Sequence, residues 1–70
     1  MYRAHDVTIR AKYREVADAI LVKHNDDIDD IAITAQRNCY GEPMVTYWIA
    51  PYIYEDFENI VNEFREAGIL

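Results

Sequence analysis

The apolar residues in the last third of the chain recur with the period of an α-helix, and this pattern limits the possible folds more than any other. Acidic residues open the segment, and Gly68 follows it where a left-handed residue ends a helix, so that Ile69 can fold back onto Phe64. The sequence predicts a helix at about 54–67 that must bury one apolar stripe. The residues of this stripe are Ile53, Phe57, Ile60, Val61, Phe64 and Ala67.

A second helical pattern occupies the first third of the chain, but its starting point is ambiguous. The β-branched residues Val7, Thr8 and Ile9 could belong to a short strand over residues 4–10. Against this, no Gly, Pro, Asn or Ser separates them from the helix that follows, and Asp6 could cap a helix from Val7 to about Lys23. We favour the long helix. Its predicted apolar face consists of Ile9, Tyr13, Val16, Ala17, Ile20 and Leu21.

Between the helices, two segments rich in β-branched and aromatic residues predict a β-hairpin. They are residues 31–37 and 44–50, and the sequence Tyr40-Gly41-Glu42-Pro43 between them has the composition of a turn. A helical stripe from Ile28 to Ala35 is the competing interpretation, but the β-branched residues there favour a strand.

Seventy residues are enough for one hydrophobic core, so residues 1–70 are predicted to form a single domain. The predicted fold is α+β, in the order α-β-β-α or β-α-β-β-α, with an antiparallel sheet and the helices packed on one face. A hairpin with an unpaired edge invites a partner strand, so a homodimer is also an expectation.

Three features of the sequence indicate a cytoplasmic protein, or one of the host cytoplasm if the chain is viral. The longest aliphatic run, Ala19 to Val22, is too short to cross a membrane, and the charged first residues are unlike a secretory signal. Since Cys39 is the only cysteine, the chain cannot form an intramolecular disulfide, which suits a reducing compartment.

Neither catalysis nor cofactor binding is predicted. The chain has no serine, and no signature joins Cys39 to His5 or His24 as a thiolate–imidazole pair. The two glycines, Gly41 and Gly68, are expected at a turn and at a helix end, so the chain has no glycine-rich phosphate-binding loop. We therefore expect a protein that is not an enzyme and holds no cofactor.

The acidic run from Asn25 to Asp30 invites comparison with a calcium loop. Set from Asn25, the EF-hand template finds oxygen ligands at its first, third and fifth positions. It then finds Asp30 where glycine is required and Gln36 where the bidentate glutamate belongs. A casual divalent-cation site stays open as an alternative, but we expect a solvated acidic turn and no metal site.

Charge is divided unevenly along the chain. Residues 1–24 hold five basic and three acidic residues, whereas residues 25–70 hold two basic and ten acidic ones, so the net charge of −6 comes from the second part. Such a negative field repels phosphates, and we expect no direct nucleic acid binding. The carboxylates predicted to steer a basic partner are Asp26, Asp27, Asp29, Asp30, Glu55, Asp56 and Glu58.

Four of the nine aromatic residues lie within eight positions: Tyr47, Trp48, Tyr52 and Tyr54. In a strand, Tyr47 and Trp48 point to opposite faces, and helices on one side cannot cover both. Some rings should stay exposed, and Tyr and Trp are common anchors at protein interfaces. We predict that these four residues contact a partner; the alternative is that they form the core and a dimer interface of the protein itself.

In size, acidity and lack of catalytic groups, the chain resembles the small acidic inhibitors that phages encode. Those proteins act against host defence, as anti-CRISPR or anti-restriction proteins, or against host nucleic-acid machinery. The resemblance implies a stoichiometric inhibitor that covers a basic, nucleic-acid-binding surface of a partner protein and so acts as a nucleic-acid mimic. A structural or regulatory homodimer is the alternative, and nucleic acid binding through the basic first helix is a third hypothesis.

Overall fold

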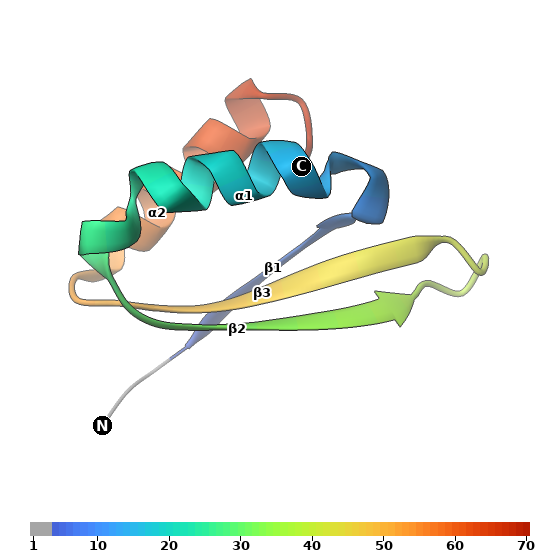
Figure 1. The fold of residues 1–70 in the computed structure, drawn as a ribbon, viewed down its shortest axis with the longest axis horizontal. Coiled ribbons are helices and arrows are strands. Elements are labelled where there is room, and N and C mark those ends of the chain that lie inside the picture. The colour runs from blue at the N-terminus through green and yellow to red at the C-terminus, as the bar shows by residue number, and fades with distance from the viewer. Residues whose placement is uncertain (1–3) are drawn as a thin grey trace.

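Three strands form an antiparallel sheet in the order β1-β3-β2 in the computed structural model, which describes residues 4–70 (Figure 1). The strands are β1 (His5–Arg10), β2 (Ile28–Arg37) and β3 (Pro43–Pro51). Both helices, α1 (Arg14–Lys23) and α2 (Tyr54–Glu66), lie on the same face of the sheet (Figure 1). Short 3-10 turns at Ala11–Tyr13 and Asn25–Asp27 connect α1 to the strands before and after it.

The predicted α+β class is confirmed, and of the two orders the one that begins with a strand, β-α-β-β-α, is observed. The favoured long helix from Val7 to Lys23 is therefore wrong. Val7 and Ile9 pair with Tyr47 and Val45 of β3, so the sheet uses their alternation. The 3-10 turn makes the corner between β1 and α1 without a glycine or proline, which is why the sequence carries no visible break there.

The hairpin confirms the two predicted strands and extends the first of them back to Ile28. Asn38 organises its turn, because the side-chain Oδ1 accepts hydrogen bonds from the backbone N–H groups of Tyr40 and Glu42, both at 2.9 Å. Gly41 has a φ of 77°, a left-handed conformation that glycine adopts without steric cost.

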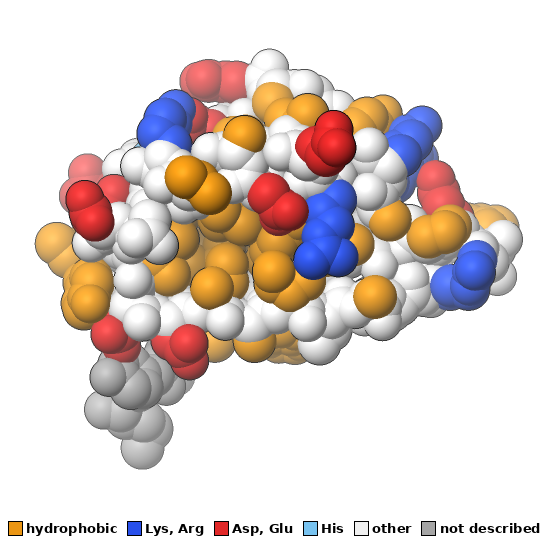
Figure 2. All heavy atoms as spheres, in the orientation of Figure 1, with side chains coloured by type: hydrophobic (Ala, Val, Ile, Leu, Met, Phe, Trp, Pro, Cys, Tyr) orange, Lys and Arg blue, Asp and Glu red, His pale blue; other side chains and the backbone are white. Residues whose placement is uncertain are grey.

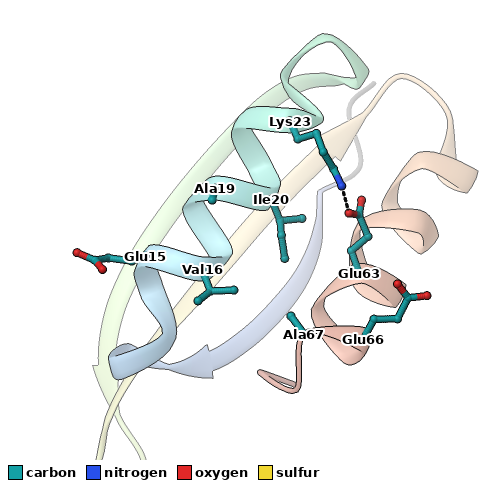
Figure 3. Close-up of a pocket in the computed structure, with 8 residues that line it drawn as sticks. All are labelled: Glu15, Val16, Ala19, Ile20, Lys23, Glu63, Glu66 and Ala67. Carbon is teal, nitrogen blue, oxygen red and sulfur yellow. Dashed lines mark hydrogen bonds and ion pairs between the residues drawn. The ribbon is translucent and has the colours of Figure 1, made fainter.

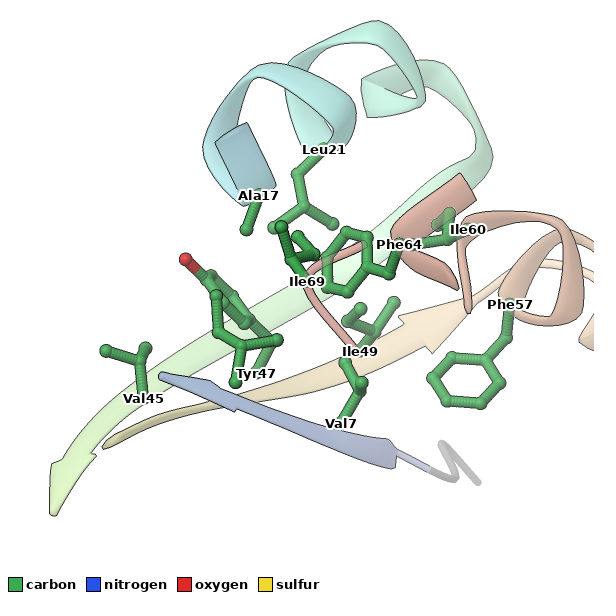
Figure 4. Close-up of a cluster of buried hydrophobic side chains, with 11 residues drawn as sticks. Val7, Ala17, Leu21, Val45, Tyr47, Ile49, Phe57, Ile60, Phe64 and Ile69 are labelled. Carbon is green, nitrogen blue, oxygen red and sulfur yellow. The ribbon is translucent and has the colours of Figure 1, made fainter. Parts of the chain in front are cut away.

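The core lies between the helices and the helix-facing side of β1 and β3 (Figure 4). Helix α2 buries Phe57, Ile60 and Phe64 of its predicted apolar stripe. Ile53, which was predicted to belong to the same stripe, precedes the helix and is exposed, and Ala67 at the other end is exposed as well. Beyond its end, the N–H of Ile69 donates to the carbonyl of Phe64 at 3.1 Å, and that of Gly68 donates to Arg65 at 3.0 Å. These two bonds are the predicted Schellman cap, and they bring Ile69 into the core.

None of the helices formed by residues 4–70 combines the length and the apolar character that a membrane-spanning segment requires.

Candidate protein-binding site

The fold brings the two predicted groups of carboxylates to one end of the sheet. Strand β2 begins where β3 ends, with Ile28 opposite Pro51, and the N–H of Tyr52 donates to the carbonyl of Asp27 at 3.2 Å. Helix α2 starts two residues later. We call this region the acidic end; its residues are Asp26, Asp27, Asp29, Asp30, Tyr52, Tyr54, Glu55, Asp56 and Glu58.

Most of these carboxylates are not neutralised within the part of the chain that the structure describes. Asp27 lies 3.4 Å from Nδ1 of His24, and Asp30 accepts the backbone N–H of Ile31 at 2.9 Å. Among residues 4–70, the remaining carboxylates of the acidic end take part in no ion pair. Their charge is therefore directed to solvent, where it is available to a cationic partner.

The four predicted aromatic anchors do not share one surface, and Tyr47 is not on the surface at all. Its ring is completely buried in the core, edge-on to Phe64 (Figure 4). Its hydroxyl donates to Asp18 at 2.8 Å. Burial, and then the hydrogen bond to Asp18, raises the pKa of the Tyr47 phenol far above its ordinary value. Tyr47 has no surface to offer a partner, so the prediction that it anchors one is wrong.

Trp48 lies on the opposite face of β3, which neither helix covers, and its side chain is 41% exposed. Its indole N–H donates to Thr34 of β2 at 3.2 Å, which fixes the orientation of the ring. Asp6 of β1 lies opposite Trp48 in the sheet, and Asp30 is opposite Ala50, two residues further along the same face. A ring flanked by carboxylates on an open sheet face is well placed to receive a cationic side chain.

Tyr52 and Tyr54 are exposed where β3 passes into α2. Tyr54 contacts His5 of β1 in an edge-to-face arrangement with ring centroids 4.8 Å apart. The ring centroids of His5 and Phe57 lie 5.1 Å apart. This contact joins the beginning of β1 to the beginning of α2 and holds the Tyr54 ring. Tyr52 is the more open of the two, at 68% exposure.

Asp6 and His5 are neighbours of the site that sequence reasoning missed. The predicted long helix from Val7 places Asp6 at a helix cap and not in a strand. The signal that could have found it is the alternation of β1, in which Asp6 and Thr8 lie on the face opposite to Val7 and Ile9.

A separate groove runs between α1 and α2 on the far side of the core from the sheet (Figure 3). It has a volume of about 710 Å³, and the exposed side chain of Val16, predicted to face the core, lines it. Glu63 closes one end of the groove, because it accepts hydrogen bonds from Nζ of Lys23 and Nε2 of His24. These bonds, that of Lys23 first, hold the pKa of Glu63 below its ordinary value.

Two further findings bear on chemistry. Within residues 4–70 there is no group of three or more His, Cys, Asp or Glu side chains that could hold a metal ion. Cys39 is exposed in the hairpin turn. Neither protein-family models nor curated proteins nor solved structures give a match to this chain.

Proposed function

We propose that the protein is a non-enzymatic acidic binding protein that covers a basic, nucleic-acid-binding surface of a partner protein. It would act as a stoichiometric inhibitor, of the kind phages encode against host defence or host nucleic-acid machinery. The observation that supports this most is the meeting of seven carboxylates and two exposed tyrosines at the acidic end, next to Trp48 on the open sheet face.

The two kinds of residue would do different work. Carboxylates on the Asn25–Asp27 turn, on the beginning of β2 and on α2 present a field of negative charge, as the phosphates of a nucleic acid do, and they accelerate the encounter with a basic surface. Tyr52, Tyr54 and Trp48 contribute rigid apolar area, over which arginine or lysine side chains can stack. The net charge of −6 opposes direct binding of nucleic acid itself.

The proposal places this activity in the cytoplasm. An exposed, unpaired thiol such as that of Cys39 stays reduced there, whereas an oxidising compartment would favour its modification.

Affinity capture at two salt concentrations, followed by a nucleic-acid-binding assay, tests the proposal. The protein is immobilised, partners are captured from lysate at low and at high salt, and each captured protein is tested for loss of DNA or RNA binding at equimolar inhibitor. We expect the association rate to fall at least about tenfold between low and high salt, because exposed charges are screened within about 10 Å. A captured partner that still binds nucleic acid in the complex would count against occlusion.

A matched pair of variants separates the acidic end from net charge. Asp26→Asn with Glu58→Gln removes two charges at the acidic end, whereas Glu15→Gln with Glu66→Gln removes two exposed charges on the α1–α2 groove. We expect the first pair to slow association several-fold more than the second. Equal effects from both pairs would contradict a specific acidic site.

Trp48→Ala tests the aromatic component. We expect it to leave the mass and fold intact and to weaken partner capture by at least about tenfold, the usual cost of truncating an aromatic anchor. If the variant instead splits a dimer, the aromatic side chain belongs to self-association and the occlusion proposal loses its anchor.

A further inference from the structure

Strand β2 forms one edge of the sheet, and its middle lacks the features that usually protect an edge. The other edge strand, β1, has only six residues and carries Asp6 and Arg10. In contrast, β2 has ten residues, and from Ile31 to Gln36 it contains no charged residue and no proline. An exposed, uncharged edge strand of this length is an open template for another strand.

The hairpin turn shows which main-chain groups of β2 face outward. The N–H of Asn38 donates to Glu42 at 3.0 Å, so these residues form a hydrogen-bonded pair. In an antiparallel ladder such pairs alternate, and Pro43 opposite Arg37 has no N–H to give. It follows that Gln36, Thr34 and Ala32 bond to β3, while the main-chain groups of Ile31, Ile33 and Ala35 point to the open edge. At that edge the carboxylate of Asp30 accepts the N–H of Ile31 at 2.9 Å, whereas Ile33 and Ala35 have no such side-chain cap.

The side chains of the same three residues are also incompletely covered. They lie on the helix-facing side of the sheet, opposite Ile49, Tyr47 and Val45, yet Ile31 and Ile33 are 37% and 43% exposed. Figure 2 shows the consequence: apolar surface fills a hollow between α1 above and β2 below. Val22 of α1 adds a further exposed apolar side chain on the outside of the helix, at 75% exposure.

The charge along this edge changes from acidic at the beginning of β2 to basic at its end. Asp29 and Asp30 stand at the beginning of β2, and Arg37 stands at its end. Arg14 of α1, which also pairs with Asp18, lines a small pocket together with Ala35 and Arg37, so a second guanidinium group lies near this end of the strand. A strand that is acidic at one end and basic at the other is complementary to an antiparallel copy of itself.

We propose that β2 pairs antiparallel with β2 of a second copy, in the register that places Ile33 opposite Ile33 on the two-fold axis. In this register Ile31 lies opposite Ala35 of the second copy, and the main-chain groups of both residues face outward, as a hydrogen-bonded pair requires. The N–H of Ile31, which donates to Asp30 in the single chain, exchanges that bond for one to the second strand. Asp29 and Asp30 lie at the β-bulge that begins β2, and in this register they come near Arg37 of the second copy, once at each end of the interface. The two sheets join into one of six strands, and the apolar hollows of both copies meet between the α1 helices.

This interface uses Asp29 and Asp30 of the acidic end, but it leaves the other residues of that end and the open face around Trp48 free, and each dimer carries two copies of them. The inference does not depend on the proposed function, because it rests on the β2 edge alone.

The test is the mass in solution, measured by size-exclusion chromatography with light scattering across a wide concentration range. We expect twice the mass of one chain, falling to one chain on dilution. Ile33→Lys places two like charges directly opposite each other on the axis, and we expect it to raise the dissociation constant of the dimer at least tenfold, with an unchanged circular dichroism spectrum. Leu70→Lys is the matched control, since it adds the same charge at a leucine that is 50% exposed, and it should leave the mass unchanged.

A charge swap tests the register and does not depend on the folding of a single variant. Arg37→Glu alone and Asp29→Arg alone should each weaken the dimer, whereas the double variant should restore much of the loss, because opposite charges again face each other. A single-chain mass at every concentration overturns the proposal. A dimer that Ile33→Lys does not weaken overturns the β2 interface, and a double variant weaker than both single ones overturns the register.

Discussion

At the scale of single residues, Tyr47 shows how one side chain can serve both the core and a polar contact. Its ring fills the centre of the core, and its hydroxyl reaches out to Asp18, a residue of α1 that also pairs with Arg14 at 3.6 Å. The contact therefore ties the middle strand of the sheet to the helix above it.

Tyr47→Phe keeps the ring and removes this tie. Because Asp18 is partly exposed and regains water when the bond is lost, we expect the free energy of unfolding to fall by only about 1 kcal/mol. Urea denaturation at neutral pH measures the change. A loss above about 3 kcal/mol would show that the hydroxyl supports more of the structure than this one bond.

The same variant has a distinct pH dependence. The folded protein raises the pKa of Tyr47, so the stability linked to this group is complete below the ordinary pKa of tyrosine, about 10, and is lost as the pH rises above it. Wild-type protein should therefore lose stability more steeply above about pH 10 than Tyr47→Phe does. Parallel curves for the two proteins would contradict a raised pKa.

Glu63 gives stability the opposite pH dependence, at acidic pH. Lys23 and His24 hold its folded pKa below the ordinary value of 4.5, so the stability linked to Glu63 is present above that pH and is lost as the pH falls through the folded value. We expect Glu63→Gln to be less stable than wild type at neutral pH and to lose less on acidification. Thermal unfolding between about pH 7 and pH 3 measures both, with the exposed Glu66→Gln as the control.

At the scale of elements, the end of α2 shows how backbone conformation directs a side chain. Gly68 has a φ of 74°, and this left-handed turn is what sends Ile69 back into the core. Nothing lies within 4 Å of the position that a Cβ on Gly68 would occupy, so any cost of substitution comes from the backbone alone.

Gly68→Ala should lower the free energy of unfolding by about 1 kcal/mol, because alanine is strained at positive φ. Gly68→Asn should cost less, since asparagine tolerates this conformation better than alanine. Chemical denaturation of the two variants ranks them. If alanine proves as stable as glycine, the Schellman cap contributes little to the fold.

At the scale of the whole molecule, the helices cover the sheet unevenly. They bury the helix-facing side of β1 and β3 but leave that side of β2 half-exposed, and the face that carries Trp48 is uncovered. A 70-residue domain buries only about 60% of the surface of its unfolded chain, so its own core leaves a small margin of stability. Association along β2 would add to that margin.

The proposed β2 dimer predicts that stability depends on protein concentration. If β2 joins two copies, the midpoint of thermal unfolding should rise with protein concentration, because the folded dimer is favoured by mass action. Ile33→Lys should abolish the dependence and keep the monomer folded. A wild-type midpoint that does not change with concentration would contradict the dimer.

The elements with the strongest sequence signals were predictable, and the reason is local. The stripe of α2, the glycine beyond it and the hairpin around Gly41 depend on the period and on backbone preferences of residues close in sequence. The start of the chain was mispredicted because Val7, Thr8 and Ile9 suit a strand or a helix, and pairing with β3, about 40 residues away, decides between them.

For the candidate site, too, the sequence showed one part and only the structure showed the other. Its residue types were readable from the sequence, since the carboxylates and rings that exceed the needs of a small core stand in the second part of the chain. The sequence did not show which of the rings are exposed. The helices pack on one side of β3, and this choice of side decides that Tyr47 is buried and Trp48 is exposed.

By itself, the sequence determined the helical and strand periods of the apolar residues, the turns, the excess of acidic residues after residue 24 and the α+β class. Each of these depends on neighbouring residues and their intrinsic preferences. Only the tertiary structure decided that Asp26–Asp30 meets Tyr52 and Tyr54, that Asp6 stands beside Trp48, and that β2 is the uncovered edge. These outcomes depend on strand order and on the face that the helices choose. Both follow from burying the most apolar surface of the whole chain at once, a property that no single segment carries.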